Sequence, residues 1–165
     1  MIHTLILAFL LIYTVPPPAA HPAKDAISTA GIKDLQKLIK ERKDKILVLN
    51  VWATWCIPCK EEMPDLNKLA EKNKNIEVVG LSIDYPDEIE SKIKPFLKKQ
   101  PVKFRILVNT ETSDEKLINF LSPDWGGAIP ATFIYDTKGK LQAVLEGKKS
   151  YEEFEAALKK LKSKS

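Results

Sequence analysis

The chain has 165 residues, of which 44% are hydrophobic and 29% are charged. This length and composition predict one globular domain and exclude an intrinsically disordered chain. The formal net charge of +4 comes from 26 Lys and Arg against 22 Asp and Glu, mixed in stretches such as KLIKERKDK. A nucleic-acid binder typically carries a one-sided basic stripe, so we expect no nucleic-acid partner.

Residues 1–23 read as an export signal. The apolar run MIHTLILAFLLIYTV has about the length of a signal-peptide core and is shorter than a membrane-spanning helix, and the proline-rich PPPAAHPA follows it. We expect cleavage near Ala20, although Pro18 fits poorly at the −3 position and no Lys or Arg precedes the run. An uncleaved anchor or a buried N-terminal element stays open, whereas a lipid anchor is not predicted because no Cys lies near Ala20. Residues 24–165 are expected to form the domain.

The first half of the domain predicts a strand, helix, strand unit. A helix is expected before it, near residues 30–42, with Ser28 or Thr29 as N-cap. The apolar run KILVLNVWA (45–53) then predicts a central buried strand, and IEVVGLSID (76–84) a second one. A helical face starts between them at Ile57, and this order favours a parallel strand pair.

The second half predicts the edge of a mixed sheet. The segment ATFIYDTKGKLQAVLEG (131–147) is typical of a β-hairpin turning at Lys138 and Gly139. Ser150 and Glu153 form a capping-box pattern that opens a last amphipathic helix. Before the hairpin, we expect three elements: a helix over Asp87–Lys99, a strand at 104–108 and a helix over Glu111–Leu121.

The only cysteines of the chain, Cys56 and Cys59, lie three positions apart where the first strand meets its helix. A structural zinc site needs four ligands, and the only histidines, His3 and His21, lie in residues 1–23. A structural disulfide of this spacing would close too short a loop to stabilise much. We therefore favour a reversible pair, in which the helix start lowers the pKa of an exposed Cys56 thiol and Cys59 attacks the resulting mixed disulfide.

Prolines and tryptophans surround this pair. Pro58 lies in the first helical turn, where a missing N–H costs little, whereas Pro64 should kink the helix and remove one hydrogen bond. Trp52 is expected in the core, and Trp55 on the rim of the Cys56 sulfur. Trp125 either joins an apolar docking patch or lies buried under its loop.

The stretches NVWATWCIPCKEEMP and GGAIPATFIYD resemble the thioredoxin superfamily, and more closely its exported TlpA/ResA-like thiol-disulfide oxidoreductases, over roughly Leu35 to Leu161. The resemblance implies an α/β thioredoxin-like fold: a central mixed sheet flanked by helices, with an insertion between the second core strand and a cis-proline turn. It also implies that Cys56 attacks, that Cys59 resolves, and that Pro130 is the cis-proline facing them. Ile129 would then pair with an extended substrate chain. From the residues alone, an ordinary edge-strand start is the favoured interpretation of Pro130, and the resemblance reverses it.

Two polar residues bear on the proton chemistry. Asn50 stands where thioredoxin carries a buried aspartate used in proton transfer, and an amide cannot titrate. Glu62 lies one helical turn after Cys59, where ResA-like proteins have a glutamate near the active site. Burial would raise its pKa and let it exchange the thiol proton. The alternative is a solvated carboxylate like the neighbouring Glu61.

The expected function is thus an exported, periplasmic or otherwise extracytoplasmic, thiol-disulfide oxidoreductase without a cofactor or metal. Its site would comprise Cys56, Cys59 and Glu62, with Trp55, Ile129 and Pro130 binding substrate. The resemblance favours the reducing direction, with apocytochrome c or misoxidised exported proteins as substrates, a membrane electron donor upstream, and a monomeric enzyme. A copper-binding chaperone is the alternative. A thiol peroxidase is not expected because no cysteine lies outside the pair.

Overall fold

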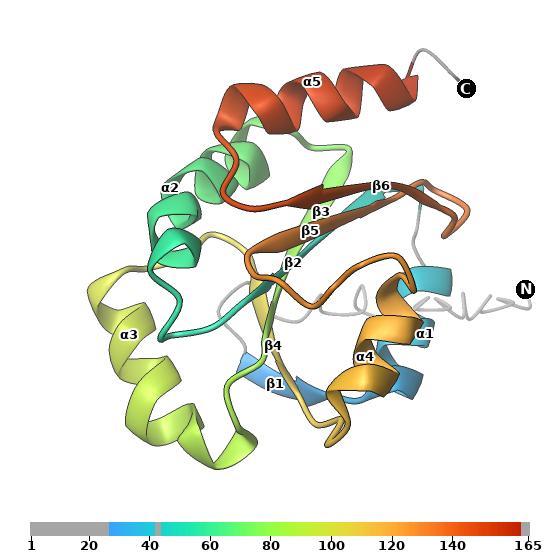
Figure 1. The fold of residues 1–165 in the computed structure, drawn as a ribbon. Helices are drawn as coiled ribbons and strands as arrows, with labels where there is room; N and C mark the ends of the chain where they lie inside the picture. Colours follow the sequence, from blue (N-terminus) through green and yellow to red (C-terminus); the bar gives the residue numbers. More distant parts are fainter. Residues whose placement is uncertain (1–26, 42–43, 163–165) are drawn as a thin grey trace, which may run out of the picture.

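The structure, a computed structural model, describes residues 27–41 and 44–162. The expected signal segment, with Ala20, His3 and His21, lies outside these residues. Six strands form one mixed sheet in the order β1-β4-β3-β2-β5-β6, the last two antiparallel to their neighbours (Figure 1). The strands are β1 (Ile27–Ala30), β2 (Ile46–Trp52), β3 (Ile76–Ser82), β4 (Arg105–Asn109), β5 (Ala131–Tyr135) and β6 (Leu141–Glu146). The predicted thioredoxin-like mixed sheet is confirmed.

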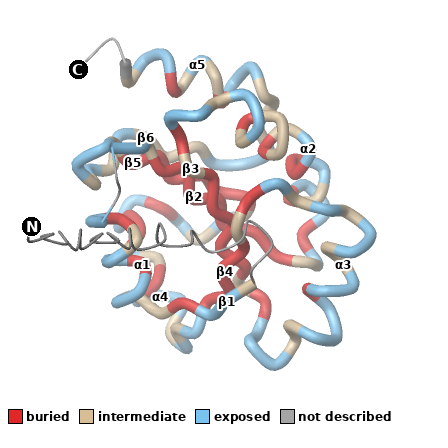
Figure 2. The backbone as a smooth tube through the Cα atoms, turned by 180° about the vertical axis from the view of Figure 1, so that it is seen from behind, coloured by how far each residue is buried: buried red, intermediate tan, exposed pale blue. Residues whose placement is uncertain are grey.

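Helices cover both faces of the sheet (Figure 1). On one face, α2, α3 and α5 pack against strand residues such as Val48 and Trp52; on the other, α1 and α4 pack against Leu49 and Val51. Successive strand residues face opposite sides, so both sets must be apolar when both faces are covered. Figure 2 shows the resulting buried centre along β2 and β3. The helices are α1 (Ile32–Lys40), α2 (Ile57–Lys72), α3 (Lys94–Lys99), α4 (Asp114–Leu121) and α5 (Tyr151–Lys162).

The predicted N-cap of the first helix is wrong. Ser28 and Thr29 belong to strand β1, where they pair in parallel with Leu107 and Val108 of β4. The helix begins after Gly31, whose N–H donates to the Asp34 carboxylate at 3.0 Å. A four-residue edge strand shows too little alternation to be recognised, and its pairing partner lies about eighty residues away in the chain.

The helix predicted over Asp87–Lys99 is three short pieces. A 3₁₀ turn, η1 (Pro86–Glu88), leads into a π-helical turn, η2 (Ile89–Ile93), and only then into α3. Pro95 has no N–H for an α-helical hydrogen bond, and the turn before it is widened, with Lys94 N–H donating to the Ile89 carbonyl.

The remaining elements lie close to their predicted places. Helix α4 begins three residues late because Ser113 caps it, accepting the Lys116 N–H at 3.3 Å. The hairpin β5–β6 turns at Gly139, which has a positive φ of 80°. The capping box of the last helix is confirmed, with hydrogen bonds of 2.8 and 3.3 Å between Ser150 and Glu153.

Helix α2 continues through Pro64 to Lys72. Since Pro64 has no N–H, the Lys60 carbonyl four residues earlier lacks its helical donor. The side chain of Gln100, which follows α3, donates to that carbonyl at 2.6 Å. The predicted missing hydrogen bond is therefore replaced by a tertiary one that ties α3 to the helix bearing the cysteines.

Gly80 of β3 lies at a closely packed point of the core. A Cβ built there would lie 2.8 Å from Ile106 Cδ1, 3.0 Å from Trp52 Nε1 and 3.2 Å from Phe104 Cε2. All three side chains are buried in the same core cluster, where a shift of one side chain affects its packed neighbours.

We predict that Gly80→Ala lowers the free energy of unfolding by about 1–3 kcal/mol, because overpacking a dense core forces side chains off their preferred conformers. Urea denaturation of the oxidised protein measures it. Gly126→Ala is the matched control, because a Cβ there meets no atom within 4 Å and its φ is not positive. Equal stability of the two variants would contradict the prediction.

Candidate active site

The two cysteines form a disulfide at the start of α2. Strand β2 ends at Trp52, and a turn closed by Cys56 N–H to the Ala53 carbonyl at 3.2 Å delivers Cys56 to the helix N-cap. The S–S distance to Cys59 is 1.99 Å. The Cys56 sulfur accepts the Cys59 N–H at 3.2 Å. A helix N-terminus offers unpaired N–H groups and a positive potential, which favour a thiolate at this sulfur.

The pair is buried in this oxidised form, and Cys56 is the more accessible sulfur-bearing residue. Its relative exposure is 5%, against 1% for Cys59. The expectation of an openly exposed Cys56 is therefore wrong for the disulfide state. The side chains on either side of Cys56 are instead exposed, Trp55 at 61% and Ile57 at 65%.

The Ile129–Pro130 peptide bond is cis, as the resemblance implied. Pro130 leads into β5, whose first residue, Ala131, pairs with Val51 near the end of β2. The antiparallel pairing thus brings the start of β5 to the sheet end that carries Cys56. Pro130 is buried, and its carbonyl accepts the Gly147 N–H at 2.8 Å. Within residues 27–41 and 44–162, the main chain of Ile129 has no hydrogen-bond partner.

Glu62 is buried in α2, with 1% of its surface exposed. One carboxylate oxygen accepts from the Asn50 amide at 2.7 Å, and the other from the Lys149 main-chain N–H at 2.6 Å. The same Asn50 amide also donates to Thr132 Oγ1 at 3.0 Å. The two polar residues that the sequence placed separately therefore form one buried unit, joined to β5 and to the loop before α5.

Burial raises the pKa of Glu62 to about 7, against the opposing effects of the hydrogen bonds from Lys149 and Asn50 and of the Lys149 charge. A carboxyl group with this pKa changes protonation near neutral pH. Glu61 differs: it is exposed and pairs with Lys148 Nζ at 2.8 Å. The two neighbouring carboxylates are thus distinct in burial and in partner.

Trp125 is buried under its loop and does not join an exposed docking patch. Its indole N–H donates to the Ala128 carbonyl at 2.9 Å, and its ring packs edge-on against Phe133. It therefore supports the glycine-rich loop that leads to Pro130.

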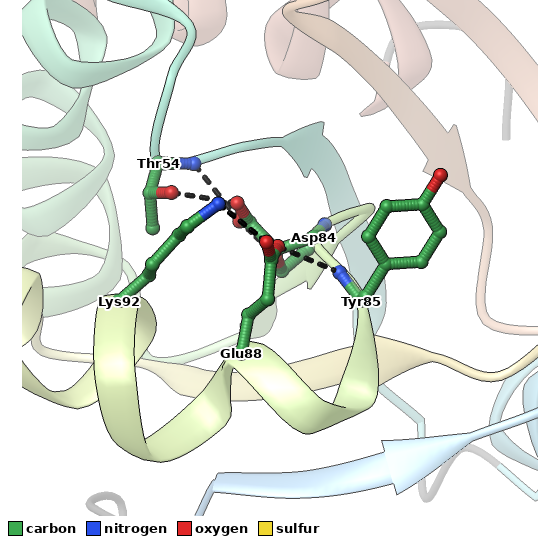
Figure 3. Close-up of polar contacts among 6 residues, drawn as sticks. Thr54, Asp84, Tyr85, Glu88 and Lys92 are labelled. Carbon is green, nitrogen blue, oxygen red and sulfur yellow. Dashed lines mark hydrogen bonds and ion pairs between the residues drawn. The ribbon is translucent and has the colours of Figure 1, made fainter.

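Sequence reasoning missed three contributors. The Lys149 main-chain N–H has no sequence signal, because any residue at that position other than proline offers one. Asp84 and Thr54, which hydrogen-bond each other beside the cysteine turn (Figure 3), carried a weak signal as polar residues at strand ends. Nothing in the sequence indicated that they meet.

The described part of the chain holds no group of three or more His, Cys, Asp or Glu side chains that could bind a metal. The copper-chaperone alternative finds no support. Among these same residues, no helix has the length and apolar character needed to cross a bilayer.

Comparisons with known proteins agree with this geometry. The AhpC/TSA family matches residues 21–144. Thiol-disulfide oxidoreductase ResA of Bacillus cereus is 34% identical over 125 residues, which cover 74% of this chain and 67% of that protein. A thioredoxin-related protein from Neisseria meningitidis serogroup B superposes with a TM-score of 0.63 at 29% identity, covering 73% of this chain and 87% of that one. A DsbF homologue from Corynebacterium diphtheriae gives 0.62 at 25% identity, covering 73% and 74%.

The family match spans most of the chain, and the cysteine pair occupies the strand–helix junction of a thioredoxin-like sheet. The chain therefore belongs to the AhpC/TSA family within the thioredoxin superfamily and is a ResA-like thiol-disulfide oxidoreductase.

Proposed function

We propose that this protein is an exported enzyme that reduces disulfides in other proteins by way of Cys56. The observation that carries the proposal is the Cys59 N–H donated to the Cys56 sulfur at the N-cap of α2. In the reduced enzyme, the same N–H would stabilise a Cys56 thiolate, which is the form that attacks a disulfide.

The reaction proceeds in two exchanges. The Cys56 thiolate attacks one sulfur of the substrate disulfide, and the other substrate sulfur leaves as a thiolate that takes up a proton. Cys59, as a thiolate, then attacks the Cys56 sulfur and restores the Cys56–Cys59 disulfide, and the second substrate sulfur leaves as a thiolate that takes up a proton. Two electrons pass from the enzyme to the substrate, so a donor must reduce the pair again. We assign that step to a membrane protein.

Glu62 is suited to the proton that Cys59 must lose in the second exchange. It lies one turn beyond Cys59 on α2, and both side chains are buried. Water has little access to such a thiol, so a carboxyl group with a pKa of about 7 is a well-matched acceptor at neutral pH. Asn50, which cannot titrate, would hold the carboxylate in place through its 2.7 Å hydrogen bond.

A substrate chain can lie between the exposed Trp55 and the cis-proline loop. The main chain of Ile129, without a hydrogen-bond partner among the described residues, offers a donor and an acceptor to an extended peptide. This arrangement favours protein disulfides over small ones. Apocytochrome c and misoxidised exported proteins both present such segments.

Location and direction have separate support. Export is supported by the apolar run of residues 1–23 and its proline-rich junction. Stable disulfide substrates also occur chiefly outside the cytoplasm. The reducing direction rests on the resemblance to the ResA-like branch.

We predict that Cys59→Ser retains partner proteins as mixed disulfides on Cys56, because the resolving sulfur is absent and the first exchange still occurs. Non-reducing electrophoresis and mass spectrometry of the purified variant identify them. Cys56→Ser is the control and should retain far fewer. Equal trapping by both variants would reverse or abolish the assigned roles.

Glu62→Gln should slow disulfide reduction by at most about 100-fold and change the pH dependence of the rate near pH 7, because the amide cannot accept a proton. Stopped-flow exchange between pH 5 and 9 measures both effects. Glu61→Gln, which changes an exposed carboxylate on the same turn, should leave the profile unchanged. If Glu62→Gln and Glu61→Gln show the same small effect, then Glu62 is a structural carboxylate and water accepts the proton.

Stability provides a second readout for the same variant. The pKa of Glu62 is raised in the folded state, so between about pH 4.5 and pH 7 the folded protein holds a proton that the unfolded chain has released. The wild type should therefore lose stability as pH rises through this window, by at most about 3 kcal/mol. Glu62→Gln should lack this loss in urea denaturation.

We predict that the mature protein begins near Ala20, because an apolar run this short suits translocation better than permanent spanning. Mass spectrometry of the protein from the producing cell gives its N-terminus. An intact Met1 in the membrane fraction would instead indicate a tethered enzyme.

A further inference from the structure

Asp84 is a buried carboxylate outside the cysteine pair and Glu62. It follows β3, and 2% of its surface is exposed. One oxygen accepts the Thr54 N–H at 2.9 Å and the Ser82 hydroxyl at 2.6 Å, and the other accepts the Thr54 hydroxyl at 2.6 Å. Figure 3 shows Thr54 and Asp84 facing each other across the two loops. The carboxylate is thus satisfied by three donors, two of which belong to a single residue.

That residue is part of the turn that places the nucleophile. Thr54 is the second residue of the turn closed by Cys56 N–H to the Ala53 carbonyl at 3.2 Å. The β2–β3 ladder reaches Trp52 and Ser82, and Ile83 N–H adds one more bond to the Trp52 carbonyl at 2.9 Å. Beyond this point the main chains separate, and Asp84 is the link that continues between them.

We propose that Asp84 is a positioning residue for Cys56: its carboxylate holds Thr54, and thereby the turn, so that the Cys56 sulfur meets the Cys59 N–H. Hydrogen bonds to an ionised acceptor are stronger than those between neutral groups, and both donor groups of Thr54 are engaged. The inference rests on the proposed role of Cys56 as the attacking thiol.

The negative charge of Asp84 acts on the Cys56 thiol in the opposite direction to the proposed positioning. An anion near a thiol disfavours the thiolate, so removing that charge alone would make Cys56 more reactive. The charged residues Asp87, Glu88, Glu90 and Lys92 follow Asp84 in the chain; Lys92 pairs with Glu88 (Figure 3), and the charge of Asp84 also acts on Lys92. Slower reaction of Cys56 without Asp84 would therefore report lost positioning and not lost charge.

The test is the alkylation rate of Cys56 in the reduced full-length protein, measured by peptide mass spectrometry with iodoacetamide from pH 5 to 9. Asp84→Ala should react about tenfold more slowly at pH 7, with the midpoint of the profile moved to higher pH, because the sulfur loses a well-aligned donor. Thr54→Val, which removes only the hydroxyl donor, should show a smaller change in the same direction.

Two variants serve as controls. Thr54→Ser keeps both donor groups and should show the wild-type alkylation profile of Cys56. Asp87→Asn removes an exposed charge from the same loop and should leave the profile unchanged. If Asp84→Ala does not fold, the comparison of Thr54→Val with Thr54→Ser carries the test.

An unchanged or faster alkylation profile in Asp84→Ala and Thr54→Val, accompanied only by a lower melting temperature, would overturn the proposal and leave Asp84 a structural residue. Alkylation needs no protein substrate. A wild type that alkylates normally but reduces no protein disulfide would therefore contradict the proposed function and leave this inference standing.

Discussion

The position of Cys56 at the N-cap of α2 is the constraint on which the rest of the site depends. The attacking role proposed for Cys56 needs its sulfur to be stabilised as an anion, and a helix N-terminus offers N–H groups that do this. The Cys59 N–H at 3.2 Å supplies the stabilisation, while the exposed Trp55 and Ile57 mark the open side. The other residues of the site lie where they can act on this one junction.

The sheet topology explains why they gather there. Strands β2 and β3 run in parallel, so their carboxyl ends lie at the same end of the sheet. The cysteine turn follows β2 there, and Asp84 follows β3. Strand β5 runs antiparallel to β2, so the beginning of β5, with Pro130 before it, lies at the same end of the sheet. Strand β6 ends at this same end of the sheet, and the loop that follows it supplies the Lys149 N–H to Glu62. Four segments thus meet at one end of the sheet, because β2 and β3 are parallel and the strand direction reverses at β5 and again at β6.

Glu62 and Asp84 are both buried carboxyl groups, but their hydrogen-bond partners differ. Glu62 has two donors for two oxygens, and burial nevertheless raises its pKa to about 7. Asp84 has three donors, two of them hydroxyl groups, and holds the turn. The first arrangement suits the proton-accepting role proposed for Glu62, and the second suits a side chain that ties two loops together. In the roles that we propose, Glu62 takes up the Cys59 proton and Asp84 positions Cys56.

The sequence by itself determined the elements whose patterns are local: the buried strand before the cysteines, the helix that follows, the hairpin and the capped last helix. It also indicated the cysteine pair, since a C-x-x-C at a strand–helix junction has few other uses. Only the tertiary structure decided the rest. The pairing of β1 with β4, the contact of Asn50 with Glu62 and the contact of Thr54 with Asp84 each join segments distant in the chain. Burial and hydrogen bonding of a side chain depend on such neighbours. For this reason the sequence left Glu62 open between a buried and a solvated carboxylate, and only the packing around α2 shows that it is buried.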